Sequence, residues 1–188
     1  MKVKWITYQY PIFDLNNNNV MYINIFDKTV GIIYITMLYN EIKPFIIILL
    51  QNLPYLEVVG SYARHENEIN DVDLITMTPP INVILDLINK TRNLYDYDVK
   101  FIGGQNAKVS VKLNNGNTFD VDIWSASTPY EFKFLRWMRT MDKYNNIAYR
   151  RLAKSKHYTL SDRYMFDNKT KEFVDFKDVE DLKNFLKQ

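Results

Sequence analysis

Apolar and polar residues alternate with a period of two along several short segments of the chain. β-branched and aromatic residues predominate there, which predicts strands over residues 56–59, 72–77, 99–102, 109–113 and 119–124. Two turn signals separate the last three of these segments, Gly103-Gly104 and residues 114–117, and the second is typical of a β-hairpin. Residues 1–37 alternate in the same way and predict two or three further strands, with a turn at 16–19.

Other segments show helical periodicity, with apolar residues three or four positions apart. They predict helices over residues 39–53, 82–93, 130–140, 143–157 and 177–187, with a short hairpin over 158–174. The pattern changes after Pro129 from mixed to mainly helical. We therefore expect an α+β fold with three parts: a β-rich extension at 1–37, a mixed β-sheet flanked by helices at 38–129, and a small, mainly helical subdomain at 130–188.

The composition narrows the class of protein. The 188 residues are 47% hydrophobic and include no cysteine, which supports a packed core and excludes disulfides, thiolate metal sites and a cysteine nucleophile. The N-terminus lacks the features of a signal peptide, and the most apolar segment, 42–53, is too short to cross a bilayer. We expect a soluble, intracellular protein without a membrane partner.

The net charge of +2 is unevenly distributed along the chain. Between residues 131 and 163 there are nine Lys and Arg residues and only three acids, whereas the first 130 residues are acidic overall. Such a distribution is typical of a polyanion-binding surface next to a site that needs carboxylates, and a solvated helix face has the same composition.

Two pairs of aspartates lie on predicted strands. Asp71 and Asp73 flank Val72, so both carboxylates point to one face of the strand while Val72 points to the other. Asp122 stands in the same relation to Asp120 on a later strand. If the two strands are neighbours in the sheet, three or four carboxylates converge, and such a cluster suits two Mg²⁺ ions.

A candidate phosphate-binding element precedes the first pair of aspartates. Gly60 follows a predicted strand, where a glycine lets the backbone approach a ligand closely, and Ser61 adds a hydroxyl donor. Arg64 lies one turn further on and can reach the same anion with two hydrogen bonds. Phosphates held here and bridged by metal to the aspartates would make a nucleoside-triphosphate site.

Together these residues resemble the signature of the nucleotidyltransferase superfamily typified by DNA polymerase β. The signature combines a Gly-Ser pair, an Asp-x-Asp that begins eleven residues after the glycine, and a third aspartate on a later strand. Residues 145–166 and 173–186 also resemble the C-terminal part of the family X DNA polymerases, so that the likeness spans 55–186. Within that family, the chain is most similar to the compact viral repair polymerases.

The resemblance implies a nucleotidyltransferase palm followed by a thumb-like subdomain. The implied reaction is the template-directed transfer of a nucleotide from a dNTP to a primer 3′-hydroxyl, with release of pyrophosphate. Asp71, Asp73 and Asp122 would be the catalytic residues and would bind two Mg²⁺ ions, for which Mn²⁺ can substitute. Asp122 would bind the ion that activates the primer hydroxyl.

The resemblance also assigns the binding residues. The expected nucleotide-binding residues are Gly60, Ser61, Arg64, Arg139, Thr140 and Asn146. The expected DNA-binding residues are Lys143, Arg150, Arg151 and Lys154. Family members usually carry an aromatic pair followed by Thr-Gly near the nucleotide sugar, whereas this chain has Met-Arg-Thr-Met at 138–141, which leaves its sugar selectivity open.

We expect a monomeric enzyme whose partners are a dNTP and a gapped or primer–template DNA duplex, acting in gap-filling repair. Two alternatives stay open: a nucleotidyltransferase that acts without a template on RNA, protein or a small molecule, and a non-catalytic subunit that binds nucleic acid. The basic segment after residue 130 favours a polymerase over the first, and the presence of all three aspartates favours an enzyme over the second. The many residues with AT-rich codons agree with a viral origin.

Overall fold

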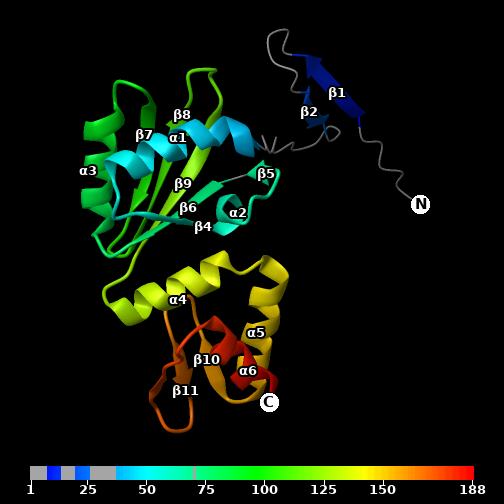
Figure 1. Ribbon diagram of the computed structural model, residues 1–188, viewed down its shortest axis with the longest axis vertical. Helices are drawn as coiled ribbons and strands as arrows, with labels where there is room; N and C mark the ends of the chain where they lie inside the picture. Colours follow the sequence, from blue (N-terminus) through cyan, green and yellow to red (C-terminus); the bar gives the residue numbers. More distant parts are fainter. Residues whose placement is uncertain (1–7, 14–19, 26–36, 70) are drawn as a thin grey trace. The chain divides into compact units, whose positions relative to one another are not determined.

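The computed structural model describes residues 8–13, 20–25, 37–69 and 71–188 (Figure 1). The chain divides into two compact units, Met1–Thr36 and Met37–Gln188. The first unit contains β1 (Tyr8–Phe13) and β2 (Val20–Ile25), which pair antiparallel. Both strands lie within the segment where two or three were predicted, and the predicted turn at 16–19 lies outside the described residues.

A five-stranded mixed sheet forms the centre of the second unit. Its strands are, in spatial order, β4 (Glu57–Val59), β6 (Asp71–Thr76), β9 (Thr118–Ser125), β8 (Asn106–Lys112) and β7 (Asp96–Ile102). The β6–β9 pair is parallel and the other pairs are antiparallel. All five strands were predicted from the alternation of apolar and polar residues, and the α+β class is confirmed.

Two helices cover one face of this sheet, α1 (Tyr39–Asn52) and α3 (Pro80–Thr91) (Figure 1). They bury apolar residues at helical spacing, such as Ile42, Phe45 and Leu49 on α1. Alternate residues of the strands, such as Val72 and Val121, complete this core because successive side chains of a strand point to opposite faces. The short helix α2 (Gly60–Ala63) follows β4, and β3 (Met37–Leu38) pairs with β5 (Glu68–Ile69).

The C-terminal part is mainly helical, as predicted. It contains α4 (Pro129–Thr140), α5 (Lys143–Ser155), the three short strands β10 (Tyr158–Leu160), β11 (Met165–Asp167) and β12 (Phe173–Val174), and α6 (Val179–Lys187). Side-chain oxygens cap the three helices: Thr128, Asp142 and Asp178 each accept a hydrogen bond from a backbone N–H of the first turn. These caps explain why the helices begin where they do.

The C-terminal part has a core of its own, formed by Phe134, Met138, Tyr149, Ala153, Leu160, Met165, Phe176, Leu182 and Leu186. A smaller cluster joins α4 to the sheet, in which Leu135 packs on Val59 and Ile75. Ile75 lies two residues after Asp73, so α4 packs on the face opposite α1 and α3. The predicted boundary at 129–130 lies between the residues of the sheet core and those of the C-terminal core. Both cores belong to the second unit, so this boundary stays a prediction. Among the described residues, no helix is long and apolar enough to cross a membrane.

Candidate active site

The predicted carboxylates lie side by side on the two parallel strands at the centre of the sheet. Asp73 on β6 stands opposite Asp122 on β9, and Asp71 stands opposite Asp120. Val72 between the first two is fully buried on the other face. The structure therefore brings together on one face the three aspartates that sequence reasoning selected, and it places Asp120 next to them.

Gly60 presses its backbone against one of these carboxylates. Its φ angle is +72°, in the left-handed region that favours glycine. A Cβ atom built on Gly60 would lie less than 3.0 Å from Asp73 Oδ2, closer than real Cβ atoms come to other atoms. No other residue fits here unless Asp73 moves, so Gly60 and Asp73 are packed as one unit.

Trp124 and Arg139 hold the other oxygen of the same carboxylate. The indole Nε1 of Trp124 donates a hydrogen bond of 3.2 Å to Asp73 Oδ1. The guanidinium of Arg139 lies 3.7 Å from the centre of the indole ring, and its Nη1 is 3.8 Å from Asp73 Oδ1. Asp73 thus has one oxygen held by a hydrogen bond from Trp124 and an ion pair with Arg139, while the second oxygen faces Gly60.

Lys108 on β8 supplies a second cation to the carboxylates. Its Nζ is 3.2 Å from Asp122 Oδ1 and 3.5 Å from Asp120 Oδ2. Sequence reasoning missed both Lys108 and Trp124. The signal for Trp124 was present, since it follows Asp122 by two residues and shares its face, whereas Lys108 becomes visible only through the register of β8 against β9.

Burial and mutual repulsion alter the ionisation of the carboxylates. Burial raises the pKa of Asp73 to about 6, and the negative charges of Asp71 and Asp122 act in the same direction. Arg139 and the indole hydrogen bond oppose that rise in pKa. Burial also raises the pKa of Asp122, against the opposing effect of Lys108. These carboxylates are incompletely neutralised by the protein, as expected of groups that receive a cation from outside.

A basic pocket of about 450 Å³ opens beside Asp73. Its lining residues come from α2, β6, α4, α5 and the β10–β11 loop: Gly60, Arg64, Asp73, Met138, Arg139, Met141, Lys143, Asn146, Ile147, Arg150 and Asp162. Four cationic side chains and only two carboxylates are among them. The size is that of a small-molecule site, and the charge favours an anionic ligand.

Two donors near this pocket lack a partner. The hydroxyl of Ser61 and the Nε of Arg139 are buried and make no hydrogen bond within the described part of the chain. Buried donors without partners are rare because each costs about 1–3 kcal/mol. Both residues had been selected as nucleotide-binding, and their free hydrogen-bonding capacity fits an incoming ligand.

Arg64 is partly engaged by the protein. It lines the pocket, but its Nη1 donates to the carbonyl oxygens of Arg139, Thr140 and Met141 at 3.3–3.4 Å, and its Nε donates to Glu66 at 2.8 Å. The last carbonyls of α4 have no partner within the helix, and Arg64 supplies one. Arg64 therefore fastens the end of α4 to α2, and its expected contact with a phosphate stays a prediction. Thr140 is exposed and does not line the basic pocket.

Asn146 and Arg150 are also engaged by the protein. Asn146 Nδ2 donates to the carbonyl of Met138 at 2.8 Å, and Arg150 Nε donates to Asn146 Oδ1 at 2.6 Å. Asp162 accepts hydrogen bonds from both Arg150 and Arg139, which ties α4, α5 and the β10–β11 loop together at the pocket wall. Both residues line the pocket, with part of their hydrogen-bonding capacity already used, and their predicted roles in binding nucleotide and DNA stay predictions.

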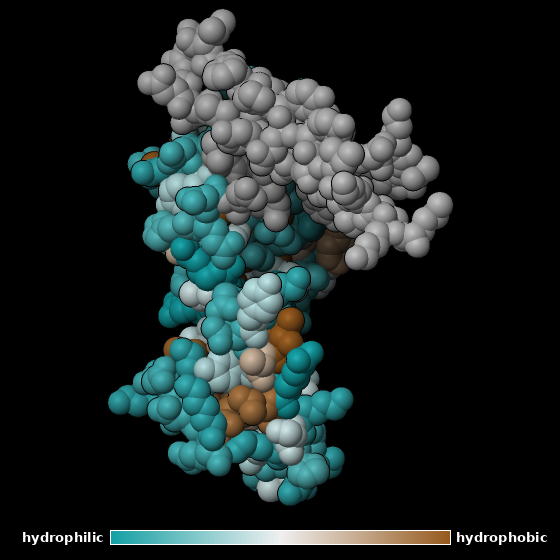
Figure 2. Space-filling view, turned by 90° about the vertical axis from the view of Figure 1, so that its right-hand side faces the viewer, coloured by the Kyte–Doolittle hydropathy of each residue, from teal (hydrophilic) through white to brown (hydrophobic). Residues whose placement is uncertain are grey.

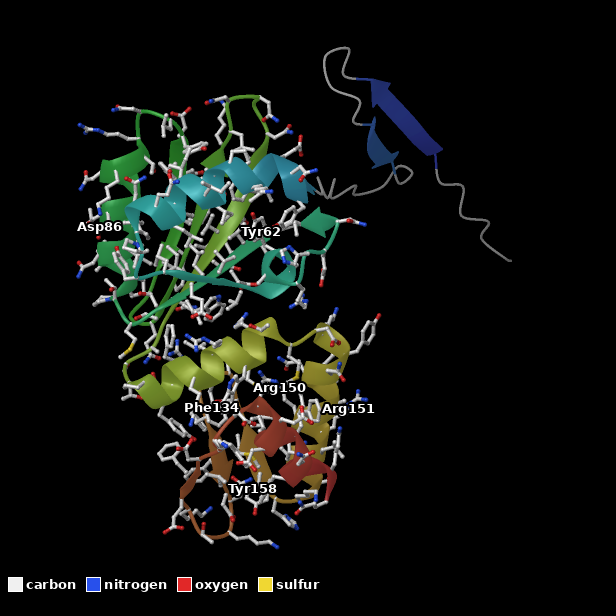
Figure 3. The ribbon with its side chains drawn as sticks, viewed as in Figure 1. Tyr62, Asp86, Phe134, Arg150, Arg151 and Tyr158 are labelled. Carbon is white, nitrogen blue, oxygen red and sulfur yellow. The ribbon has the colours of Figure 1, made fainter. Side chains whose placement is uncertain are left out.

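The remaining predicted DNA-binding residues are free. Lys143, Arg151 and Lys154 are exposed on α5 and form no ion pair within the described residues. Figure 3 shows Arg151 on the outer side of the helix. The face of the molecule that includes α5 is mostly hydrophilic, with small hydrophobic patches (Figure 2).

Asp71, Asp73 and Asp122 are the residues that could hold a divalent cation. Across the described residues, no group of three or more His, Cys, Asp or Glu side chains is arranged to enclose a metal ion by itself. Mg²⁺ is commonly bound by one or two carboxylates together with water and substrate phosphates, so an open set of aspartates fits this ion. The carboxylates, which Lys108 and Arg139 balance only in part, lie beside the basic pocket and match that description.

Comparison with known proteins gives no identification. No protein-family model matches the chain, and no curated protein sequence matches it. The resemblance to the nucleotidyltransferases thus rests on the motif residues and on the geometry described above.

Proposed function

We propose that this protein is a template-directed DNA polymerase of family X that fills short gaps during repair. The observation that carries the proposal is the pairing of Asp73 with Asp122, with Gly60 against the first and a basic pocket beside it. Two-metal nucleotidyl transfer needs carboxylates on neighbouring strands, a close backbone approach and cations for a triphosphate. The site combines all three.

Different residues of the site would bind the metal ions and the phosphates. Asp71, Asp73 and Asp122 would hold the metal ions, which neutralise charge on the reacting phosphate and lower the pKa of the acceptor hydroxyl. Arg139 and Lys143 line the basic pocket, and Ser61 follows the lining residue Gly60; these three residues would position the β and γ phosphates.

The acceptor oxygen would attack the α-phosphorus as the bond to pyrophosphate breaks. Asp122 lies where it would help to accept the hydroxyl proton, and burial raises its pKa, which favours that role.

The mainly helical part after residue 129 would serve as the thumb-like subdomain. Its helix α5 starts at the pocket with Lys143 and carries Arg151 and Lys154 outward on its exposed side. Such a row of free cations suits the phosphates of a duplex, whose binding weakens as salt concentration rises.

The test is extension of a gapped DNA duplex with each dNTP in turn against each template base, in the presence of Mg²⁺. We expect incorporation that follows the template and a loss of at least about a hundredfold in Asp122→Asn. Asp120→Asn is the matched control, because Asp120 lies on the same strand and face and is more exposed, and it should extend primers nearly as fast as the wild type.

Three outcomes would refute the proposal. Incorporation indifferent to the template would indicate a template-independent nucleotidyltransferase. Duplex binding without Mg²⁺-dependent turnover on any substrate would indicate a non-catalytic subunit. Unchanged activity in Asp122→Asn would remove the central carboxylate pair from the mechanism.

A further inference from the structure

The edge strand β7 leaves one side of the five-stranded sheet open. Within the described residues, β7 pairs with β8 on its inner side and with no strand on its outer side. Most of its side chains are exposed, among them Val99 at 39% and Ile102 at 42%. These two residues pair with the buried Val109 and Ala107, so they lie on the face that α1 and α3 cover. An open edge with exposed apolar residues is a place where another strand can pair.

Helix α3 carries exposed apolar residues at the same edge. Ile81 and Leu85 are 43% and 51% exposed, and together with Ile88 they follow one side of the helix. The opposite side of α3 is tied to the end of α1, because Lys90 donates a hydrogen bond of 2.8 Å to the carbonyl of Asn52. Figure 1 shows α3 at the outer edge of the sheet, with α1 on its inner side. The three apolar residues therefore face outward, above the open strand.

The exposed residues of α3 and β7 lie at the same level along the edge. A short loop joins α3 to β7, and the hydroxyl groups of Thr91 and Tyr97 are hydrogen-bonded, so the two elements run in opposite directions from this contact. A strand rises about 3.3 Å per residue and a helix about 1.5 Å. Val99 is therefore about level with Leu85 and Ile88. The strand and the helix together present one apolar surface.

The charges of β7 select the strand that can pair with it. Asp98 and Lys100 flank Val99 and form an ion pair, with 68% and 47% of their side chains exposed. In an antiparallel pair of two β7 strands centred on Val99, each Asp98 lies opposite the Lys100 of the other copy. Each charge then has an opposite charge beside it in its own strand and another across the pair. A pair centred on Asp98 or on Lys100 would instead bring two like charges together.

The β-bulge in β7 keeps this pairing short. Lys100 has no partner on β8, because the register shifts between Val99 and Phe101. Bulges and charged residues prevent open edges from pairing with unrelated strands. Here the charges at 98 and 100 oppose a neutral strand and fit a second copy of β7. Helix α3 would supply the rest of the contact, since a twofold axis at Val99 brings the two helices side by side.

We propose that two copies of this chain associate through β7 and α3, with the β7 strands antiparallel about Val99 and the apolar residues of the two α3 helices in contact. This association goes beyond the proposed function and replaces the monomer that we expected from the sequence. It joins the two sheets edge to edge, and the twofold symmetry closes the assembly at a dimer.

The dimer would leave both candidate active sites open. The carboxylates lie on the face opposite α3, so the two sites share one face of the joined sheet. Five strand spacings separate Asp122 from its counterpart, which corresponds to about 24 Å.

The test is an exchange of charges, followed by sedimentation velocity over a range of protein concentrations. Asp98→Lys makes both charges of the strand positive, and Lys100→Asp makes both negative, so each variant brings like charges together in its own dimer. An equimolar mixture of the two variants restores opposite charges across the pair, although the ion pair within each chain stays broken. The mixture thus separates association from any effect within one chain.

Leu85→Gln tests the contribution of the helix. Ile47→Gln is its matched control, because Ile47 is 46% exposed on α1 and Leu85 is 51% exposed on α3. Far-ultraviolet circular dichroism compares the fold of every variant with that of the wild type.

We expect the wild type to sediment at twice the mass of one chain at about 50 µM. Asp98→Lys and Lys100→Asp should each raise the dissociation constant at least about tenfold, because two attractive pairs become repulsive. The mixture should return to within about threefold of the wild type. Leu85→Gln should raise the dissociation constant about tenfold, and Ile47→Gln should leave it unchanged.

Four results would overturn the inference. They are a monomeric wild type at every concentration, single charge variants that associate like the wild type, a mixture of the two that stays monomeric, and equal association by Leu85→Gln and Ile47→Gln. Sedimentation does not depend on nucleotidyl transfer, so each of these results leaves the proposed function to be decided by primer extension.

Discussion

Replacement of Gly60 by alanine tests whether its backbone and Asp73 form one packed unit. The new methyl group would lie less than 3.0 Å from Asp73 Oδ2 and 3.1 Å from Asp73 Cβ. Trp124 holds the other oxygen of that carboxylate, so Asp73 cannot turn aside without losing a hydrogen bond. The substitution therefore strains the centre of the candidate site.

The expected loss has two components. An L-residue at a φ of +72° costs about 1–2 kcal/mol in the left-handed region, and overpacking costs about 1–3 kcal/mol more. Gly116→Ala isolates the first component, because Gly116 has a φ of +86° and a Cβ there would meet nothing within 4 Å. Gly60→Ala should thus lower the free energy of unfolding by about 2–5 kcal/mol and Gly116→Ala by about 1–2 kcal/mol.

Urea unfolding, followed by tryptophan fluorescence and far-ultraviolet circular dichroism, gives both values. The double variant Gly60→Ala with Asp73→Ala removes Oδ2 and Cγ, the carboxyl atoms that the methyl group meets, so a coupling energy of about 1–3 kcal/mol should appear in the double-mutant cycle. Equal losses in Gly60→Ala and Gly116→Ala, or a coupling energy below about 0.5 kcal/mol, would refute the packing argument.

Three further predictions concern the side chains around the site. Burial raises the pKa of Asp73 from 3.8 to about 6, so between these values the folded protein binds more protons than the unfolded chain. As pH rises from 4 to 6 without divalent cations, this difference should lower the free energy of unfolding by about 2 kcal/mol. In urea unfolding, Asp73→Asn should lack this decrease, and an identical pH profile would contradict it. Trp124→Phe keeps an aromatic ring but removes the hydrogen bond to Asp73. The Mg²⁺ concentration for half-maximal primer extension should therefore rise several-fold. Trp137→Phe breaks no contact with the carboxylates and should leave this concentration unchanged. Arg64→Met removes the donor that fastens the end of α4 and should lower the free energy of unfolding by about 1.5–3 kcal/mol. Arg151→Met, at an exposed position, should lower it by less than about 0.5 kcal/mol. Similar losses in the two variants would show that the hydrogen bonds from Arg64 to α4 contribute little to stability.

Local patterns in the sequence were sufficient to predict most of the second unit. Alternation identified all five strands of the sheet, and capping residues such as Asp142 mark the starts of the C-terminal helices. These features depend on neighbours within a few residues, which is why they can be read from one sequence. The same reasoning showed that Asp71 and Asp73 share a face, because that follows from strand geometry alone.

Side-chain partners that come from distant segments could not be predicted in this way. Besides lining the pocket, Arg64 donates from Nη1 to carbonyl oxygens at the end of α4, 75 to 77 residues further along the chain, and the motif did not indicate this contact. Asn146 and Arg150 are likewise held in part by a carbonyl and by Asp162. A motif indicates which residue types surround a site, whereas the competition among their hydrogen-bond partners is decided by tertiary packing.

The cation that lies beside Asp122 also depends on contacts between distant segments of the chain. Lys108 stands opposite Asp122 because the β8–β9 hairpin closes through the turn at 114–117, where Gly116 adopts a positive φ. A shift of one residue in this register would bring Ala107 or Val109 opposite Asp122 and turn the side chains of β8 to the other face. The turn thus determines, from the far end of the hairpin, which cation lies beside the central carboxylate, and the proposed chemistry depends on this strand alignment.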